Sequence, residues 1–76
     1  IMYRISIRIE LEEYRKDLLV DALAEAGFEA FEDNDFGLAA YCPDSLFDES
    51  RLATILPSEA KYRVEQLDDN LWKRFI

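Results

Sequence analysis

Hydrophobic positions near the start of the chain repeat first with a period of two and then with the period of a helix. Residues 3–10 alternate strictly, which is typical of a half-buried β-strand. Its inward positions are Tyr3, Ile5, Ile7 and Ile9. From residue 11 the apolar positions recur every three or four residues, which predicts an amphipathic helix over residues 11–26. Its apolar positions are Tyr14, Leu18, Leu19, Ala22, Leu23 and Ala26. Gly27 supplies the left-handed position at which such helices end.

The middle of the chain predicts a hairpin and a second helix. Residues 28–33 and 38–42 are typical of two strands around residues 34–37, where Asn, Asp and Gly tolerate the positive φ of a tight reversal. Pro43 ends the second strand because proline cannot donate to a sheet. Asp48 is a good N-cap for a shorter helix that Pro57 terminates. The apolar side of this helix is formed by Phe47, Leu52, Ile55 and Leu56.

Residues 61–67 alternate again, so the predicted order is strand, helix, strand, strand, helix, strand. This order indicates a ferredoxin-like α+β fold, a two-layer sandwich with both helices on one face of an antiparallel sheet. The first and last strands are then neighbours, and the other face of the sheet lies open. We expect residues 1–67 to form the domain and residues 68–76 to begin a linker toward an absent catalytic domain.

The tail has apolar residues at helical spacing after the sheet is complete. These residues are Leu71, Trp72 and Phe75. Either the tail caps the core or it continues into a further part of the protein. We favour the second reading, in which Trp72 and Phe75 are candidate interdomain contacts.

Composition narrows the classes of function. The 76 residues include 17 acids and 9 bases, for a formal charge of −8, with no histidine and one cysteine. A disulfide, a zinc site and histidine-based acid–base catalysis are therefore excluded. The longest apolar run, residues 38–42, is too short to span a membrane, and no basic-then-apolar leader opens the chain, so we expect a cytoplasmic protein. The acidic charge disfavours direct nucleic-acid binding. Such a charge either attracts a basic partner or serves only to keep the protein in solution.

The open face of the predicted sheet holds the candidate binding residues. Arg4 and Arg8 of the first strand point there, as do Lys61 and Arg63 of the last. If Phe28, Ala30, Leu38 and Ala40 face the helices, Phe31 and Tyr41 share the open face with these bases. Aromatic side chains and arginine are enriched in interface cores. The partner-binding candidates are therefore Phe31, Tyr41, Arg4, Arg8 and Arg63. The alternatives are solvated charges and an aromatic pair that only stabilises the hairpin.

Several segments together resemble a known family. Residues 23–32 read Leu-Ala-Glu-Ala-Gly-Phe-Glu-Ala-Phe-Glu, and Gly-Leu-Ala-Ala-Tyr follows at 37–41 before a proline. Phe-Asp-Glu enters the second helix at 47–49, and an acidic patch precedes Trp-Lys-Arg-Phe at 72–75. In order and spacing this resembles the N-terminal domain of bacterial ribosomal protein L-eleven methyltransferases, over essentially the whole chain.

The resemblance implies a function for this chain. In that family the domain recognises the ribosomal protein, and a flexible linker joins it to a Rossmann-like domain. That second domain binds S-adenosylmethionine and methylates amino groups of lysine side chains and of the N-terminus. The resemblance thus implies that this fragment is a monomeric docking module that binds a basic ribosomal protein and has neither catalytic residues nor a cofactor. The parent protein is then the enzyme.

Other readings of the same fold remain open. One is a stand-alone RNA-binding module, although the first strand offers Ser6 where a stacking ring is wanted. A second is a small-ligand regulatory domain, for which pocket-lining glycines are missing. A small acylphosphatase-like enzyme needs a phosphate cradle, and the acids of residues 10–13 would repel phosphate.

Overall fold

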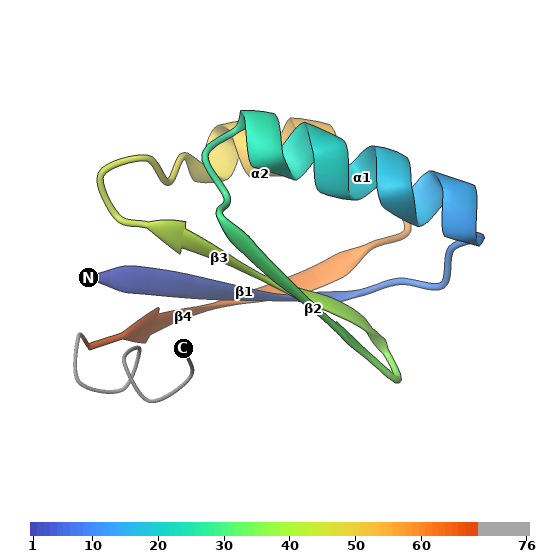
Figure 1. Ribbon diagram of the computed structural model, residues 1–76, viewed down its shortest axis with the longest axis horizontal. Helices are drawn as coiled ribbons and strands as arrows, with labels where there is room; N and C mark the ends of the chain where they lie inside the picture. The colour runs from blue at the N-terminus through green and yellow to red at the C-terminus, as the bar shows by residue number, and fades with distance from the viewer. Residues whose placement is uncertain (69–76) are drawn as a thin grey trace.

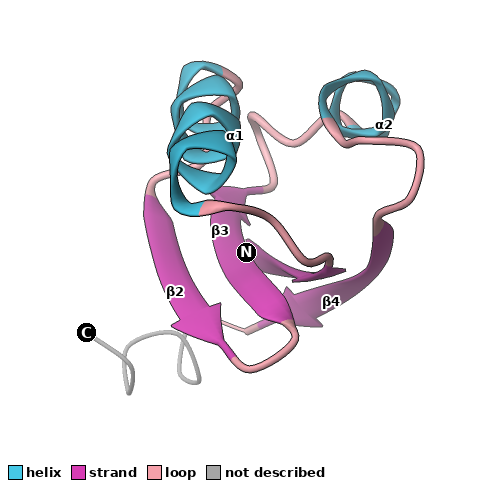
Figure 2. Cartoon of the chain, turned by 90° about the vertical axis from the view of Figure 1, so that its right-hand side faces the viewer, coloured by secondary structure: helices cyan, strands magenta, loops and turns pink. Residues whose placement is uncertain are grey.

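A computed structural model describes residues 1–68 as one antiparallel sheet beneath two helices (Figure 1). In chain order the elements are β1 (Met2–Arg8), α1 (Glu13–Glu25), β2 (Ala30–Asn34), β3 (Gly37–Pro43), α2 (Glu49–Ile55) and β4 (Lys61–Leu67). The strand order is β2-β3-β1-β4, and every pair is antiparallel. Both helices lie on the same face, α1 above β2 and β3 and α2 above β4 (Figure 2). The predicted ferredoxin-like α+β fold is confirmed, including the pairing of the first and last strands.

The main core lies between the helices and the sheet. β1 is central because it pairs with both β3 and β4, and its inward side chains Ile5 and Ile7 are almost fully buried. Around them pack the other buried side chains of this cluster: Leu19, Leu23, Phe28, Leu38, Ala40, Cys42, Leu52 and Leu56. Burial of these apolar side chains is the dominant stabilising contribution to a domain of this size.

Helix α1 presents a narrower apolar face to the sheet than its sequence indicated. Leu19 and Leu23 are its buried residues, whereas Tyr14 and Leu18 are 61% and 63% exposed. The expectation that all apolar positions of residues 11–26 face the core is therefore wrong for Tyr14 and Leu18. The helix ends as predicted, since Gly27 has φ +107° and the N–H of Phe28 donates to the carbonyl of Leu23.

Helix α2 begins and ends at the predicted residues. The Asp48 carboxylate accepts a hydrogen bond from the backbone N–H of Arg51 at 3.2 Å, which satisfies one of the orphan donors of the first turn. Leu52 is the buried residue of α2, and Leu56 and Pro57 follow its last turn. No helix of residues 1–68 combines the length and the apolar character that a bilayer crossing needs. Trp72 and Phe75 lie outside the described residues, so their interdomain role stays a prediction.

The β2–β3 hairpin is confirmed, but the positive φ predicted for its Asn and Asp residues is wrong. Among residues 1–68 only the two glycines have positive φ, so Asp35 and Phe36 reverse the chain with ordinary negative values. Gly37 has φ +153°, and a Cβ built on it would lie 2.3 Å from the carbonyl oxygen of Ile7. The close approach of β1, rather than the turn itself, therefore requires glycine at this position.

Candidate functional site: the sheet face opposite the helices

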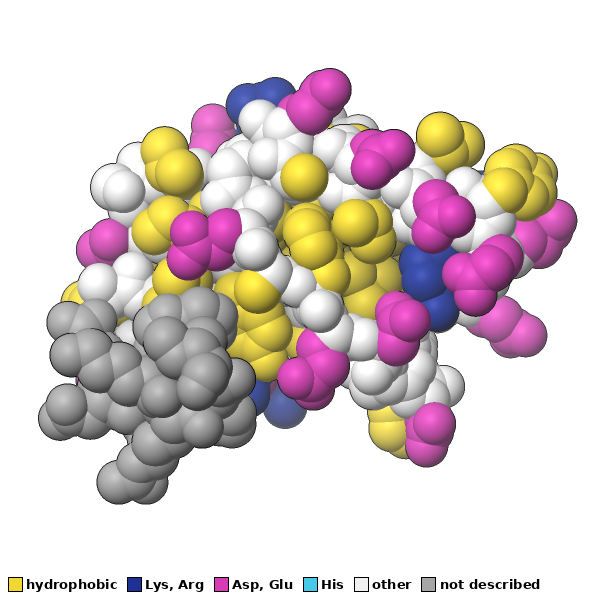
Figure 3. Space-filling view, in the orientation of Figure 1, with side chains coloured by type: hydrophobic (Ala, Val, Ile, Leu, Met, Phe, Trp, Pro, Cys, Tyr) yellow, Lys and Arg dark blue, Asp and Glu magenta, His cyan; other side chains and the backbone are white. Residues whose placement is uncertain are grey.

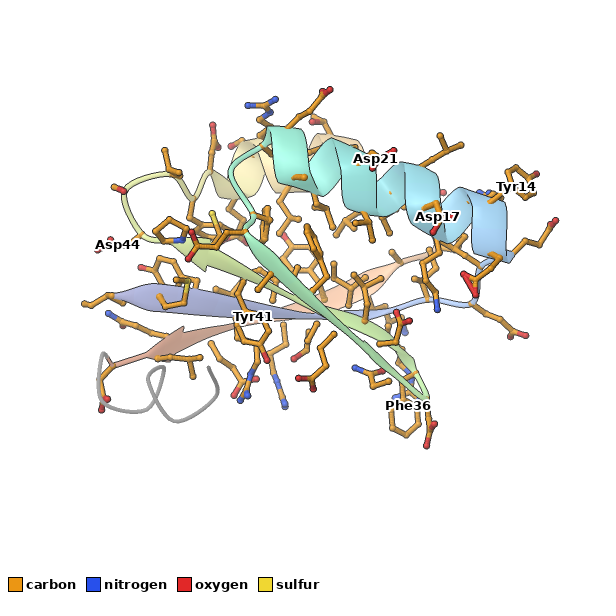
Figure 4. All side chains as sticks on the ribbon, viewed as in Figure 1. Tyr14, Asp17, Asp21, Phe36, Tyr41 and Asp44 are labelled. Carbon is orange, nitrogen blue, oxygen red and sulfur yellow. The ribbon has the colours of Figure 1, made fainter. Side chains whose placement is uncertain are left out.

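Strand register decides which side chains share the face opposite the helices. Ile5 and Ile7 face the helices, so the alternate residues of β1 point the other way. Pairing across the sheet then sets three rows: Ala30–Tyr41–Arg4–Glu65, Glu32–Ala39–Ser6–Arg63 and Asn34–Gly37–Arg8–Lys61. Figure 4 shows Tyr41 and Phe36 on this side, with nitrogen-tipped side chains between them. The predicted gathering of Arg4, Arg8, Lys61 and Arg63 on one face follows directly from this register.

Phe31 does not share this face with Tyr41. In the hairpin Phe31 pairs with Ala40 and Ala30 pairs with Tyr41, so the two rings lie on opposite faces of the sheet. Phe31 packs partly buried against the main core. The predicted common face of Phe31 and Tyr41 is wrong because Phe28 belongs to the turn after α1, where strand alternation has not yet begun.

The side chains of Arg4 and Tyr41 are fixed by contacts with their neighbours on the sheet. The Arg4 guanidinium donates to Glu65 Oε2 at 3.0 Å, and the two side chains are 28% and 32% exposed. This bond raises the pKa of Arg4 and lowers the pKa of Glu65, because each charge stabilises the other. Tyr41 is only 6% exposed and packs with Met2, Ala39 and Leu67 in a second buried cluster. The face predicted to be open is therefore accessible mainly at its other end, where Arg8 lies opposite Lys61.

At that other end, three cations line a cavity of about 420 Å³. Arg8, Lys61 and Arg63 contribute the charges, together with Ser6 and Asn34 from the same face and the ring of Phe36. Arg8 lies opposite Lys61 in the β1–β4 pair, and its guanidinium carbon is 4.9 Å from the centroid of the Phe36 ring. Phe36 is 63% exposed. This site has the mixture of fixed charge, polar groups and an exposed ring that small-molecule sites use.

The outer side of α1 carries the opposite charge. Its acids Glu13, Asp17, Asp21 and Glu25 follow one another at steps of four residues, which places them in a single row along the helix. Figure 3 shows acidic side chains along this side of the molecule, and Figure 4 shows Asp17 and Asp21 on the flank of α1 that faces the viewer, with Tyr14 at the start of the helix. Sequence reasoning missed this surface because it assigned Tyr14 and Leu18 to the core, although the spacing of the acids was visible.

Comparisons with known proteins give a partial match. No family model matches the chain, and no solved structure gives a significant match. Over 62 residues, 74% of this chain, it is 37% identical to proteins named "Ribosomal protein L11 methyltransferase" from two strains of Bacteroides fragilis. The match covers 22% of each relative, so the chain spans less than a quarter of the length of these curated proteins.

Proposed function

We propose that this chain is the substrate-docking domain of a methyltransferase that modifies a large-subunit ribosomal protein. The observation that carries this proposal is the 37% identity to ribosomal protein L11 methyltransferases over most of the chain. A docking role without a cofactor is consistent with the fold, because neither glycine belongs to a cofactor-binding turn: one ends α1 and the other lies where β3 meets β1. S-adenosylmethionine is then bound by another part of the parent protein, because its usual cradle is a glycine-rich turn between strand and helix.

The charge distribution favours α1 as the surface that meets a basic ribosomal protein. The acidic row of α1 attracts a positively charged partner, and the exposed rings and methyl groups of Tyr14 and Leu18 offer it apolar contact. Like charges four residues apart weaken a helix by a few tenths of a kcal/mol each. A bound basic partner offsets this repulsion. The sheet-face candidates Arg8 and Arg63 carry the wrong sign for such a partner.

Calorimetry with a purified large-subunit ribosomal protein L11 tests the proposal. We expect saturable binding that weakens as salt is raised, because opposite charges steer the association. Asp17→Lys places a cation in the middle of the acidic row and is expected to weaken binding about tenfold. Asp44→Lys is the matched control, since Asp44 lies in the loop after β3 and, among residues 1–68, its carboxylate has a 3.9 Å ion pair with the N-terminus while its backbone N–H donates to the Ile1 carbonyl.

The outcomes separate the two parts of the proposal. Absence of binding by the unaltered chain contradicts the docking function itself. Equal weakening by Asp17→Lys and Asp44→Lys retains docking but removes α1 as the contact surface, since both changes then act only through net charge. Tyr41→Ala and Phe31→Ala, tested alongside, measure the contact predicted for those rings.

A further inference from the structure

The cavity beside Phe36 stands out by its charge. The chain has a formal charge of −8, yet the strand register places four of its bases on this sheet face against only two acids, Glu32 and Glu65. Of the bases, Arg4 is bonded to Glu65. Within residues 1–68, Arg8 and Lys61 form no ion pair, and no carboxylate is among the described residues that line the cavity. Arg63 is 3.7 Å from Glu65, and Glu10 and Asp35 line an adjoining hollow together with Arg8 and Phe36. The described lining of the cavity itself nevertheless has three bases and no acid, so positive charge is in excess there.

We propose that this cavity binds a small phosphomonoester that carries a flat ring, such as a nucleoside monophosphate. A phosphate dianion is matched by two guanidinium groups and an ammonium group, which approach it from neighbouring strands. Ser6 and Asn34 add neutral polar groups at the same rim. The volume of about 420 Å³ lies in the range of small-ligand sites.

Phe36 supplies the surface for the ring of the ligand. It is at the tip of the β2–β3 hairpin, is 63% exposed and is in contact with Arg8. An aromatic ring left in water beside a guanidinium group offers stacking for a planar base, which is worth about 1–3 kcal/mol in nucleotide complexes. The phosphate and the base would thus be recognised by different side chains, and these contributions can be separated by mutation.

A small ligand fits this site better than a nucleic-acid strand. Glu65 lies beside the cavity, 3.7 Å from Arg63, and Glu32 lies across the sheet in the same row as Arg63. A strand with a phosphate at every nucleotide would have to pass these carboxylates, whereas one phosphate meets only the three bases. The site is also on the layer opposite α1, so this inference does not depend on the proposed docking function.

The test is calorimetric titration of the 76-residue chain with adenosine 5′-monophosphate. We expect one saturable site with a dissociation constant below about 1 mM. Arg63→Gln and Lys61→Gln should each weaken binding at least about fivefold, because each removes a charged donor. Both side chains are exposed on β4, so we expect neither substitution to affect folding. The matched control is Arg51→Gln on the exposed side of α2, which should leave the affinity unchanged.

Two further arms identify what is recognised. Phe36→Ala should weaken adenosine monophosphate binding while leaving the binding of inorganic phosphate unchanged, because only the nucleotide uses the ring. Equal affinity for the nucleotide and for inorganic phosphate would overturn the ring contact, and equal losses from Arg51→Gln and Arg63→Gln would overturn the site. Absence of nucleotide binding up to about 10 mM refutes the proposal. Tighter binding of a single-stranded RNA than of the nucleotide would assign the surface to a polymer instead.

Discussion

Gly37→Ala tests how tightly β1 and β3 approach where Gly37 lies opposite Arg8. A Cβ at this position would lie 2.3 Å from the carbonyl oxygen of Ile7 and 3.0 Å from the amide nitrogen of Ile9. Both neighbours are backbone atoms, so no side chain can rotate away. The two strands must therefore separate where Gly37 lies opposite Arg8.

The magnitude follows from what that separation breaks. The Ile9 N–H donates to the carbonyl of Phe36 at 3.0 Å, and at least one ladder hydrogen bond lies beside it. Each lost bond costs about 1 kcal/mol, and an alanine at φ +153° adds about 1 kcal/mol of backbone strain. We expect the free energy of unfolding to fall by about 3 kcal/mol, which lowers the Tm of a domain this small by more than about 10 °C.

Urea and thermal unfolding followed by circular dichroism measure this effect. Asp35→Ala is the control, because Asp35 is an exposed residue of the same turn with ordinary φ and should change stability by less than about 0.5 kcal/mol. If Gly37→Ala is as stable as the control, then β1 and β3 do not approach this closely at Gly37 and the packing assigned to this position is incorrect.

Three other predictions concern the core, the sheet surface and the cysteine. Leu23→Ala should lower the free energy of unfolding by about 2–5 kcal/mol because Leu23 is fully buried, whereas Leu18→Ala should change it by less than about 0.5 kcal/mol; comparable losses in urea unfolding would contradict the orientation of α1. Glu65→Gln should cost up to about 1 kcal/mol at pH 7. The pKa of Glu65 is lower in the folded than in the unfolded chain, so its contribution is present above pH about 4.5 and disappears as the pH falls through the folded value; an equal effect of the variant at pH 7 and pH 3 would refute the Arg4 pair. Burial raises the pKa of the Cys42 thiol, so iodoacetamide should react with it at least about a hundredfold more slowly in buffer at pH 8 than in urea, and similar rates would show that the thiol is accessible.

The order of elements was predictable because each element carries its own local signal. Alternation marks β1 and β4, Asp48 begins α2, and Gly27 ends α1, and none of these depends on distant residues. Once that order is known, the right-handed, unknotted connections of small α+β domains leave few topologies. The placement of the four bases on one face followed from strand alternation in the same way.

The details that sequence could not supply depend on packing between elements. In α1 the apolar residues form two adjoining rows, and the pattern does not say that Leu19 and Leu23 face the sheet while Tyr14 and Leu18 face water. Counting alternation through the turn after α1 misplaced Phe31. The contact between Arg8 and Phe36 joins a strand to a hairpin tip across β3, so only the folded chain brings the two together.

Within residues 1–68 the acidic row of α1 and the bases of the sheet face lie on opposite layers, so these charges together form an electric dipole directed across the sheet. The acidic row of α1 forms the negative end, and the bases at the Arg8 end of the sheet form the positive end. A basic protein approaching in solution therefore exerts a torque that turns α1 toward it before contact. At physiological ionic strength the screening length is about 8 Å, so this rotation is confined to the last moments of an encounter. The rate of productive collision should then depend on salt more steeply than the lifetime of the complex does.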